Sequence, residues 1–329
     1  MNLLATGGAG YIGAITTRLL LDAGHQVTVL DTLENGHENA VDPRATLVVG
    51  SVGDAEVLDR VLPGIDAVMH LAGYIEVAES QQYPGRYFQN NVAAPLVMLE
   101  AMVRHGVHAL VFSSTAAVYG EPEIVPIPED ARLLPVNAYG ASKLMFEQML
   151  DWYDRIHGLR SVRFRYFNVA GAWPGGEVGE AHDPETHIIP RILQAMVVGK
   201  TQFEVYGSDY PTPDGTCVRD YIHVLDLAEA HRLGLEWVGR GGESAVFNLG
   251  NGRGYSNLEV VRTCAEVTGR EVDIMLGPRR PGDPAVLIAS GSRAAKVLGW
   301  RPQRDDLRQM VRDAWEWYRG RMGSWGRST

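Results

Sequence analysis

Three residues in the middle of the chain have the types and spacing needed to move a proton. Tyr139 and Lys143 are four residues apart, so in a helix they share one face. An ammonium beside a phenol, together with the positive charge of a bound cofactor, would lower the tyrosine pKa from about 10 towards neutrality. Tyr139 could then act as a general base. Thr115, at the end of an expected strand, could hydrogen-bond the reacting oxygen, although by itself it could also be a strand-end cap.

A second group of residues is suited to holding a dinucleotide. Gly7, Gly10 and Gly13 lie between an expected first strand and an expected first helix. Glycines at this spacing permit a tight turn and let backbone N–H groups approach a pyrophosphate at the helix N-terminus. Asp31 ends the next expected strand, where a carboxylate accepts both ribose hydroxyls of an adenosine and repels a 2′-phosphate. A carboxylate at this position favours NAD over NADP. Without the glycine loop in the sequence, Asp31 would be interpreted as an ordinary turn former at a strand end.

The elements that must position these residues are short apolar runs that alternate with helical patterns. Strands are expected at residues 2–6, 26–31, 46–49, 66–70, 107–114 and 159–167, and helices at 11–23, 86–105 and 138–157. Apolar strands that alternate with helices indicate a parallel sheet covered on both faces. We therefore predict an α/β fold, a doubly wound parallel sheet (Rossmann-like) with a smaller mixed α/β substrate-binding domain.

The character of the chain changes after about residue 168. Residues 171–184 are rich in glycine, proline and acidic residues and predict a loop, and helices are expected at 188–198, 258–268 and 307–319. Turn signals at 207–215 lead into an apolar run at 218–224. We assign residues 1–170 to an NAD-binding domain, joined by a strand that returns near 245–250, and residues 171–329 to the substrate-binding domain.

Composition narrows the possible partners. The chain of 329 residues has 40 acidic and 30 basic residues and a formal net charge of -10, which disfavours nucleic acid and anionic membranes. Two cysteines, Cys217 and Cys264, are too few for a disulfide framework or a cysteine zinc site, and we expect no metal. We find neither a secretory signal nor an apolar run of the ~20 residues that cross a bilayer, so we expect a cytoplasmic protein.

Together, the glycine loop, the Tyr–Lys pair and the threonine resemble the extended short-chain dehydrogenase/reductase superfamily. Further segments are similar to the UDP-glucose (UDP-galactose) 4-epimerases over nearly the whole chain. They are HLAG at 70–73, VYG at 118–120, RYFN at 165–168, GSDYPTPDGT at 207–216, RDYIHV at 219–224, NLG at 248–250, RRPGD at 279–283 and LGW at 298–300. The stretch 209–224 is the most specific to that family.

The resemblance implies an isomerase that holds NAD tightly and epimerises a UDP-hexose at C4 through a transient 4-keto sugar. It implies catalytic roles for Thr115, Tyr139 and Lys143. The implied cofactor contacts are Gly7, Gly10, Tyr11, Ile12, Gly13, Asp31, Asn35, Ser51, Val52, Leu71, Ala72, Asn91, Ser113, Tyr139, Lys143 and Phe167. The implied substrate contacts are Thr115, Tyr139, Asn168, His187, Tyr206, Arg219, Arg280 and Asp283. Among these, the two arginines would bind the diphosphate, because a guanidinium pairs with phosphate oxygens at two points.

Three positions depart from the family or leave its specificity open. Ile75 stands where relatives often have a lysine, and Ser51 where many have an aspartate for the adenine amino group. Leu287 falls where residue size decides whether a 2-acetamido group fits, and leucine is intermediate. The preferred sugar therefore stays open between hexose, N-acetylhexosamine, pentose and uronate.

Rival functions can be weighed on the same residues. A 4,6-dehydratase needs an extra acid and base, which usually follow the threonine, but here Ala116 and Ala117 follow it. A non-catalytic NAD-sensing regulator would typically lose Tyr139 and Lys143, and a net dehydrogenase would accumulate reduced cofactor. The family commonly forms homodimers through a four-helix bundle, for which the helices at 86–105 and 138–157 are the candidates.

Overall fold

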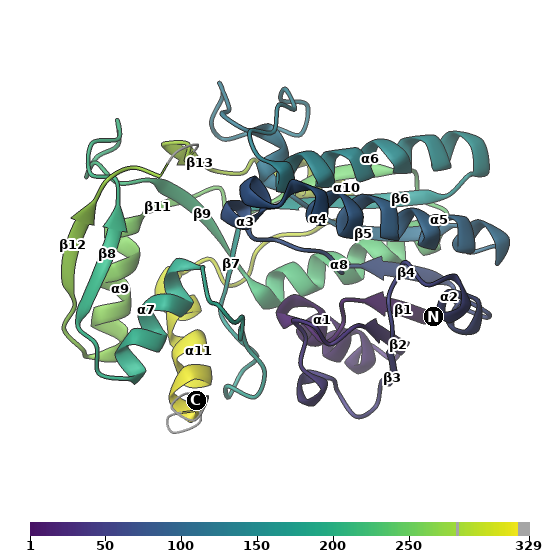
Figure 1. Ribbon diagram of the computed structural model, residues 1–329, viewed down its shortest axis with the longest axis horizontal. Coiled ribbons are helices and arrows are strands. Elements are labelled where there is room, and N and C mark those ends of the chain that lie inside the picture. Colours follow the sequence, from purple (N-terminus) through teal and green to yellow (C-terminus); the bar gives the residue numbers. More distant parts are fainter. Residues whose placement is uncertain (281–282, 322–329) are drawn as a thin grey trace.

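The computed structural model describes residues 1–280 and 283–321, which form two lobes (Figure 1). The larger lobe is built on a seven-stranded sheet in the order β10-β6-β5-β4-β1-β2-β3, and every neighbouring pair in it is parallel. Its strands are β1 (Asn2–Thr6), β2 (Gln26–Asp31), β3 (Thr46–Val49), β4 (Ala67–His70), β5 (Ala109–Thr115), β6 (Arg160–Tyr166) and β10 (Ala245–Leu249). The predicted doubly wound α/β architecture is confirmed.

Helices cover both faces of this sheet (Figure 1). On one face lie α1 (Tyr11–Asp22) and α8 (Val224–Gly239), and on the other α2 (Ala55–Val61), α5 (Ala94–Arg104) and α6 (Ala138–His157). Successive strand residues point to opposite faces, so Leu3 belongs to the core under α8 and Leu4 to the core under α5 and α6. Because both faces are buried, the central strands β1 and β4 are mostly apolar rather than alternating, whereas β6 also carries the buried Arg163 and Arg165.

The smaller lobe combines two sheets with three helices. Strands β7 (Asn168–Ala170), β9 (Val218–His223), β11 (Gly254–Ser256) and β13 (Val286–Leu287) form a mixed sheet, and β8 (Gln202–Tyr206) pairs in parallel with β12 (Asp273–Gly277). Helices α7 (Ile188–Val197), α9 (Asn257–Thr268) and α11 (Leu307–Gly320) enclose a separate apolar core. The short helix α10 (Ser292–Val297) lies beside β10. No described helix has the length and apolar character needed to cross a bilayer.

One expected helix is interrupted, and several helices were not expected, of which α8 is the longest. Instead of a continuous helix at 86–105, the structure has α3 (Val77–Gln82), α4 (Pro84–Phe88), a π-helical turn (Gln89–Ala93) and α5. Pro95 lacks the N–H that would bond one turn back, which accounts for the irregular turn before α5. Helix α8, which comes from beyond residue 170, packs on the first sheet. The single boundary at residue 170 therefore stays a proposal.

Candidate active site

The candidate catalytic residues meet at the carboxyl end of β5. Asn137 caps α6 by accepting a hydrogen bond from the N–H of Gly140 at 2.8 Å, which places Tyr139 in the first turn. Thr115 ends β5, and its hydroxyl accepts from the N–H of Ala117 at 3.1 Å, so it does cap the turn η3 (Ala116–Tyr119). The Thr115 hydroxyl also lies close enough to the Tyr139 phenol to oppose the rise in the pKa of Tyr139. Thr115 and Tyr139 are therefore close enough to act on one substrate oxygen, as the sequence predicts.

Lys143 lies one turn further along α6 and is buried. Its ammonium donates to the carbonyl oxygen of Ser113 at 3.1 Å and lies 5.0 Å from the centroid of the Phe112 ring. Burial lowers the pKa of Lys143 to about 8. The position of Lys143 is fixed by the neighbouring strand rather than by an acidic partner, since no described carboxylate forms a salt bridge with it.

The pKa of Tyr139 differs from the sequence prediction. Burial raises it to about 12, the nearby Thr115 hydroxyl opposes this rise, and the charge of Glu76 adds to it. Lys143 is not among the groups that shift it. A lowered pKa thus depends on positive charge beyond what the protein places at the phenol, which a bound oxidised nicotinamide would supply.

The glycine loop has the geometry of an anion-binding turn. Gly7 has φ +74°, and a Cβ there would lie 2.5 Å from the nitrogen of Ala72, so only glycine fits. A Cβ at Gly13 would lie 2.2 Å from the Gly7 carbonyl oxygen, so this glycine permits close contact of helix and loop. Gly10 caps α1 without any side-chain hydrogen bond, and no acidic residue lies in the first turn. The free N–H groups there suit a pyrophosphate.

Two of the predicted cofactor residues also hold this loop together. The Asp31 carboxylate accepts from the N–H of Ala9 at 3.0 Å and of Leu33 at 2.9 Å, and lone pairs remain for ribose hydroxyls. The Tyr11 side chain is turned towards the other lobe, where its hydroxyl donates to the Gly171 carbonyl oxygen at 2.6 Å. Only its backbone N–H is therefore available to an anion at the helix start.

The remaining predicted cofactor residues surround this loop. Asn35 lines a small pocket with Gly10 and Tyr11, and Ser51 lines an open cleft of about 470 Å³ with Tyr74 and Arg86. Leu71 and Ala72 directly follow β4, and Val52 is buried in the core that also contains Val68 of β4. Ile12 lies in the first turn of α1.

Near Lys143, the predicted contacts are already engaged with the protein. Asn91 exchanges hydrogen bonds with the backbone of Tyr74 at 2.9 and 3.0 Å, and the Ser113 hydroxyl lies 3.1 Å from His231 Nε2. Phe167 packs beside η3. These residues shape the walls of the site, and Asn91 has little hydrogen-bonding capacity left.

The predicted substrate residues of the second lobe form two contacts around the RRPGD segment. Arg219 on β9 forms an ion pair with Asp283, with 3.6 Å between guanidinium nitrogen and carboxylate oxygen. Arg280 lies over the ring of Tyr206, at 4.1 Å from its centroid. The structure thus brings together the four residues predicted to bind the UDP moiety; Pro281 and Gly282 of the same segment lie outside the described residues.

The other two substrate candidates lie on different elements. Asn168 begins β7, opposite Tyr221 of β9. His187 is the residue before α7, and its Nδ1 lies 2.6 Å from a carboxylate oxygen of Glu180. One ring nitrogen of His187 is therefore already used within its own loop.

The sequence analysis missed residues that position this site. The Asp220 carboxylate, inside the RDYIHV segment, accepts hydrogen bonds from the N–H groups of Asn251, Gly252 and Ala289 at 2.8 to 3.0 Å. Burial raises its pKa to about 6. Asp220 thereby joins β9 to the segments after β10 and β13, next to Arg219. Its place within the most family-specific stretch was the available signal.

Comparisons with known proteins agree with this geometry. Residues 3–250 match the NAD dependent epimerase/dehydratase family. The UDP-glucose 4-epimerase of Lacticaseibacillus casei is 48% identical over 320 residues, which cover 97% of this chain and 97% of that protein. A crystal structure of UDP-glucose 4-epimerase from Brucella ovis in complex with NAD has a TM-score of 0.93 and 42% identity, with 96% of this chain and 98% of that chain covered.

The enzyme from Bifidobacterium longum, in complex with NAD+ and UDP, has a TM-score of 0.91 and 37% identity, with 97% of this chain and 98% of that chain covered. Identity and coverage at this level extend the match to both lobes. The chain belongs to the NAD dependent epimerase/dehydratase family and, within it, to the UDP-glucose 4-epimerases.

Proposed function

We propose that the protein is a UDP-glucose 4-epimerase that interconverts UDP-glucose and UDP-galactose with NAD as its resident cofactor. The observation that carries this proposal is the placement of Thr115, Tyr139 and Lys143 at one strand end, next to a glycine loop with free N–H groups. The relatives named above are UDP-glucose 4-epimerases, and two of them were crystallised with the dinucleotide.

The residues fit the cofactor. Only glycine is tolerated at Gly7, the first turn of α1 presents unpaired N–H groups, and Asp31 lies at the end of β2. We assign the pyrophosphate to this turn, the adenosine ribose to Asp31 and the nicotinamide ribose to Lys143. When bound, NAD accepts a hydride from C4 of the sugar and returns it. Because both transfers occur in one catalytic cycle, no net oxidation results.

The chain's own residues move the proton. The Tyr139 oxygen takes the proton of the sugar 4′-hydroxyl and later gives it back, and Thr115 holds the same sugar oxygen by a hydrogen bond. The positive charge that favours the phenolate would come from the bound oxidised nicotinamide, whose ribose we assign to Lys143. At the other end of the substrate, Arg219 and Arg280 grip the diphosphate while Tyr206 and Asp283 receive the uridine. A hexose held only through its diphosphate can present either face at C4.

The competing dehydratase reaction lacks residues at this site. Loss of the C6 hydroxyl requires an additional acid and base near the sugar, whereas Thr115 is followed by Ala116 and Ala117 in the turn η3. Ala116 and Val118 are buried against Ile127. This segment offers no proton donor of its own beyond Tyr119, whose hydroxyl donates to Asn248 at 2.7 Å.

We also propose a homodimer formed through α5 and α6. Both helices expose large apolar side chains among the described residues: Leu96, Met145, Trp152 and Ile156 are 41, 44, 60 and 67% exposed. Apolar patches of this kind usually mark an interface. Light scattering of the purified chain should give twice the mass of one chain, and a monomer would contradict the proposal. The cytoplasmic location expected from the sequence stays a prediction.

One experiment tests the activity. Purified protein is incubated separately with UDP-galactose, UDP-N-acetylgalactosamine and UDP-xylose, and the rate of equilibration with each C4 epimer is measured by chromatography. We expect the fastest equilibration with UDP-galactose and no lasting absorbance from reduced nicotinamide. Inertness towards all three substrates, or accumulation of reduced cofactor, would overturn the proposal.

A further inference from the structure

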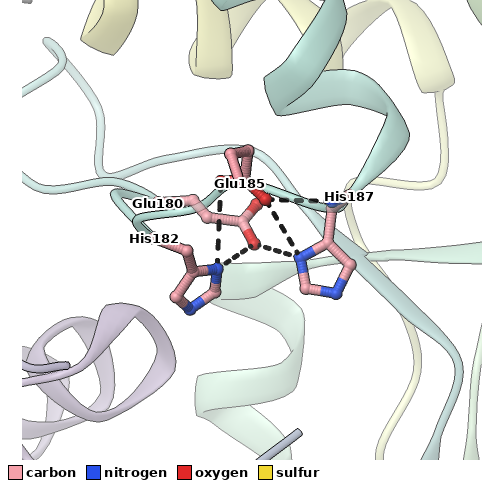
Figure 2. A group of neighbouring side chains, drawn as sticks. All are labelled: Glu180, His182, Glu185 and His187. Carbon is pink, nitrogen blue, oxygen red and sulfur yellow. Dashed lines mark hydrogen bonds and ion pairs between the residues drawn. The ribbon is translucent and has the colours of Figure 1, made fainter. Parts of the chain in front are cut away.

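The loop before α7 gathers four side chains of metal-ligand type. Glu180, His182, Glu185 and His187 lie within eight residues, and one nitrogen or oxygen from each falls within 4.8 Å of all the others. Figure 2 shows the two histidine rings on either side of the two carboxylates, each with one ring nitrogen turned towards the centre and the other turned away. Both inward nitrogens are Nδ1.

The two carboxylates of this cluster are almost completely buried. The side chains of Glu180 and Glu185 are only 5% and 3% exposed. One oxygen of Glu185 accepts from the N–H groups of Thr186 and His187 at 2.8 and 2.9 Å. Its other oxygen, Oε2, makes no hydrogen bond and faces His182 Nδ1 across 3.8 Å. A buried carboxylate oxygen without a hydrogen bond is costly, and it points into the cluster.

Four distances between ligand atoms of the cluster are close to those around a tetrahedral ion. His182 Nδ1 lies 3.2 Å from Glu180 Oε1 and 3.8 Å from Glu185 Oε2. His187 Nδ1 lies 2.6 Å from Glu180 Oε1 and 3.6 Å from Glu185 Oε1. Around Zn²⁺, bonds of about 2.0–2.2 Å in a tetrahedron place the ligands roughly 3.3–3.5 Å apart. The four distances join five atoms, because Glu185 faces His182 with Oε2 and His187 with Oε1. Three of the distances lie within half an ångström of the range for zinc ligands, and the fourth, from His187 Nδ1 to Glu180 Oε1, is shorter.

We propose that Glu180, His182, Glu185 and His187 bind one divalent transition-metal ion of the Zn²⁺ class in a four-ligand site. Two neutral imidazoles and two carboxylates carry a charge of -2 together, so their complex with a dication is neutral. Because all four positions come from protein, the site is closed and its role is structural rather than catalytic. It is separate from the proposed proton transfer at Tyr139 and does not depend on it.

The surrounding contacts indicate what the ion would stabilise. The Glu180 carbonyl oxygen accepts from Trp317 Nε1 and from the Tyr318 hydroxyl, both at 2.8 Å, which joins the loop to α11. The Ala181 carbonyl oxygen lies 2.9 Å from His37 Nε2, in the segment that follows Asp31. His187 begins α7. A metal at the centre would therefore join the start of α7 and α11 to the loop that faces the glycine turn.

A metal-free alternative makes a different prediction. If both histidines were protonated, the two imidazolium groups would neutralise the two carboxylates without any ion. The pKa of His182 is raised to about 10 and that of Glu180 is lowered to about 2, in keeping with such pairing. This arrangement leaves the Glu185 Oε2 atom without a hydrogen bond, whereas a metal ion gives it a partner.

The test is metal content of the full, untagged chain. The protein is treated with EDTA, dialysed against Zn²⁺ and then freed of excess metal. Its zinc content is measured by inductively coupled plasma mass spectrometry. We expect one Zn²⁺ per chain, and background levels in His182→Ala and Glu185→Gln. The control His157→Ala removes an exposed histidine from the end of α6 and should keep the full metal content. Equal Zn²⁺ in wild type and Glu185→Gln, or background in both, would overturn the proposal.

Two measurements on the wild-type chain decide the question if a variant does not fold. Co²⁺ added to the EDTA-treated protein should give the intense visible absorption of a tetrahedral site, which Zn²⁺ then abolishes. Zn²⁺ should also raise the Tm above that of the EDTA-treated sample, because an ion that binds only the folded state stabilises it. Neither change would occur with a histidinium–carboxylate network alone. Both readouts are made without substrate, so they are independent of epimerase activity.

Discussion

Buried basic side chains have opposite surroundings in the two lobes. In the first lobe, His70, His231 and Lys143 lie among apolar side chains and neutral hydrogen-bond partners, and burial lowers their pKa values to about 3, 4 and 8. In the second lobe, His182 and His187 lie beside two buried carboxylates, and their pKa values are raised. Among the described residues, no carboxylate forms an ion pair with these three residues of the first lobe, whereas the two histidines of the second lobe face carboxylates. Elsewhere in the first lobe, buried Arg165 does pair with Glu147 at 2.6 Å.

This difference separates the roles of the two lobes. At the catalytic end, burial raises the pKa of the Tyr139 phenol and lowers the pKa of Lys143. Positive charge brought by a bound cofactor would therefore change the protonation of these groups directly. At the UDP end, Arg219 already pairs with Asp283, so an anionic ligand must compete with an existing contact. Substitutions in the first lobe should therefore act mainly on kcat, and those in the second mainly on KM.

The largest effect is expected at the proton-transfer residue of the first lobe. Tyr139→Phe should lower kcat by about 10²–10⁴-fold, because the variant has no group to take the hydroxyl proton. The NAD released on denaturation should be unchanged, since the ring remains. Tyr153→Phe is the matched control on the same helix, where the hydroxyl bonds Glu100 of α5 rather than a residue of the proposed site, and it should keep wild-type rates. Full activity of Tyr139→Phe would remove this residue from the mechanism.

The second prediction tests the other lobe. Arg219→Gln should raise KM for UDP-galactose roughly 10- to 100-fold, because a charge-assisted hydrogen bond contributes about 1.5–3 kcal/mol. Saturating rates should change much less. Steady-state kinetics on Arg253→Gln provides the control, since that arginine lies over Tyr255 rather than beside Asp283. A fall in kcat with unchanged KM would contradict the proposed division between the lobes.

A third prediction concerns the neutral histidines of the first lobe. The pKa of buried His231 is lowered to about 4, so as pH falls from 7 to 5 the unfolded chain binds a proton that the folded chain does not. Stability contributed by this neutral residue is present above pH 6.5 and is lost as pH falls. Over this interval the wild type should lose about 2 kcal/mol more than His231→Gln, as measured by denaturant unfolding at the two pH values.

The comparison between variants is necessary because other titrating groups, which both chains share, also change the stability of the wild type between pH 7 and 5. His157→Gln, at an exposed position, should follow the wild-type pH dependence. An identical pH dependence for wild type and His231→Gln would show that His231 is not held neutral by burial.

Local patterns were enough to predict most of the first lobe. All seven of its strands were expected, six from apolar runs and β10 as the strand that returns near 245–250. Helix α6 was expected with the boundaries that the structure has, where Asn137 caps it and Gly158 ends it. Helix α8 was missed since Asp226, His231 and Gly234 lie on its buried side and disrupt the apolar period. Gly234 is required there because a Cβ would lie 2.9 Å from the Phe164 ring.

Long-range contacts could not be predicted in the same way. The ion pair of Arg219 with Asp283 joins residues 64 positions apart, and the stacking of Arg280 on Tyr206 joins two different elements. The raised pKa of Tyr139 also depends on burial, which no spacing indicates. The cluster at 180–187 is the opposite case. Its E-x-H-x-x-E-x-H spacing was visible in the sequence, but its meaning depends on the loop turning both carboxylates inward.

The smallest predicted effect lies where the lobes meet. Leu287 on β13 is opposite Arg219 in the sheet register and packs against the buried turn η3 that follows Thr115, so it contacts both regions. Leu287→Ala should raise the rate with UDP-N-acetylgalactosamine relative to UDP-galactose roughly tenfold, because the shorter side chain leaves room beside C2 of the sugar. Val286→Ala is the control, since its side chain points to the other face of the strand. An unchanged ratio of the two rates would mean that the sugar does not reach β13 and that specificity is set by the first lobe alone.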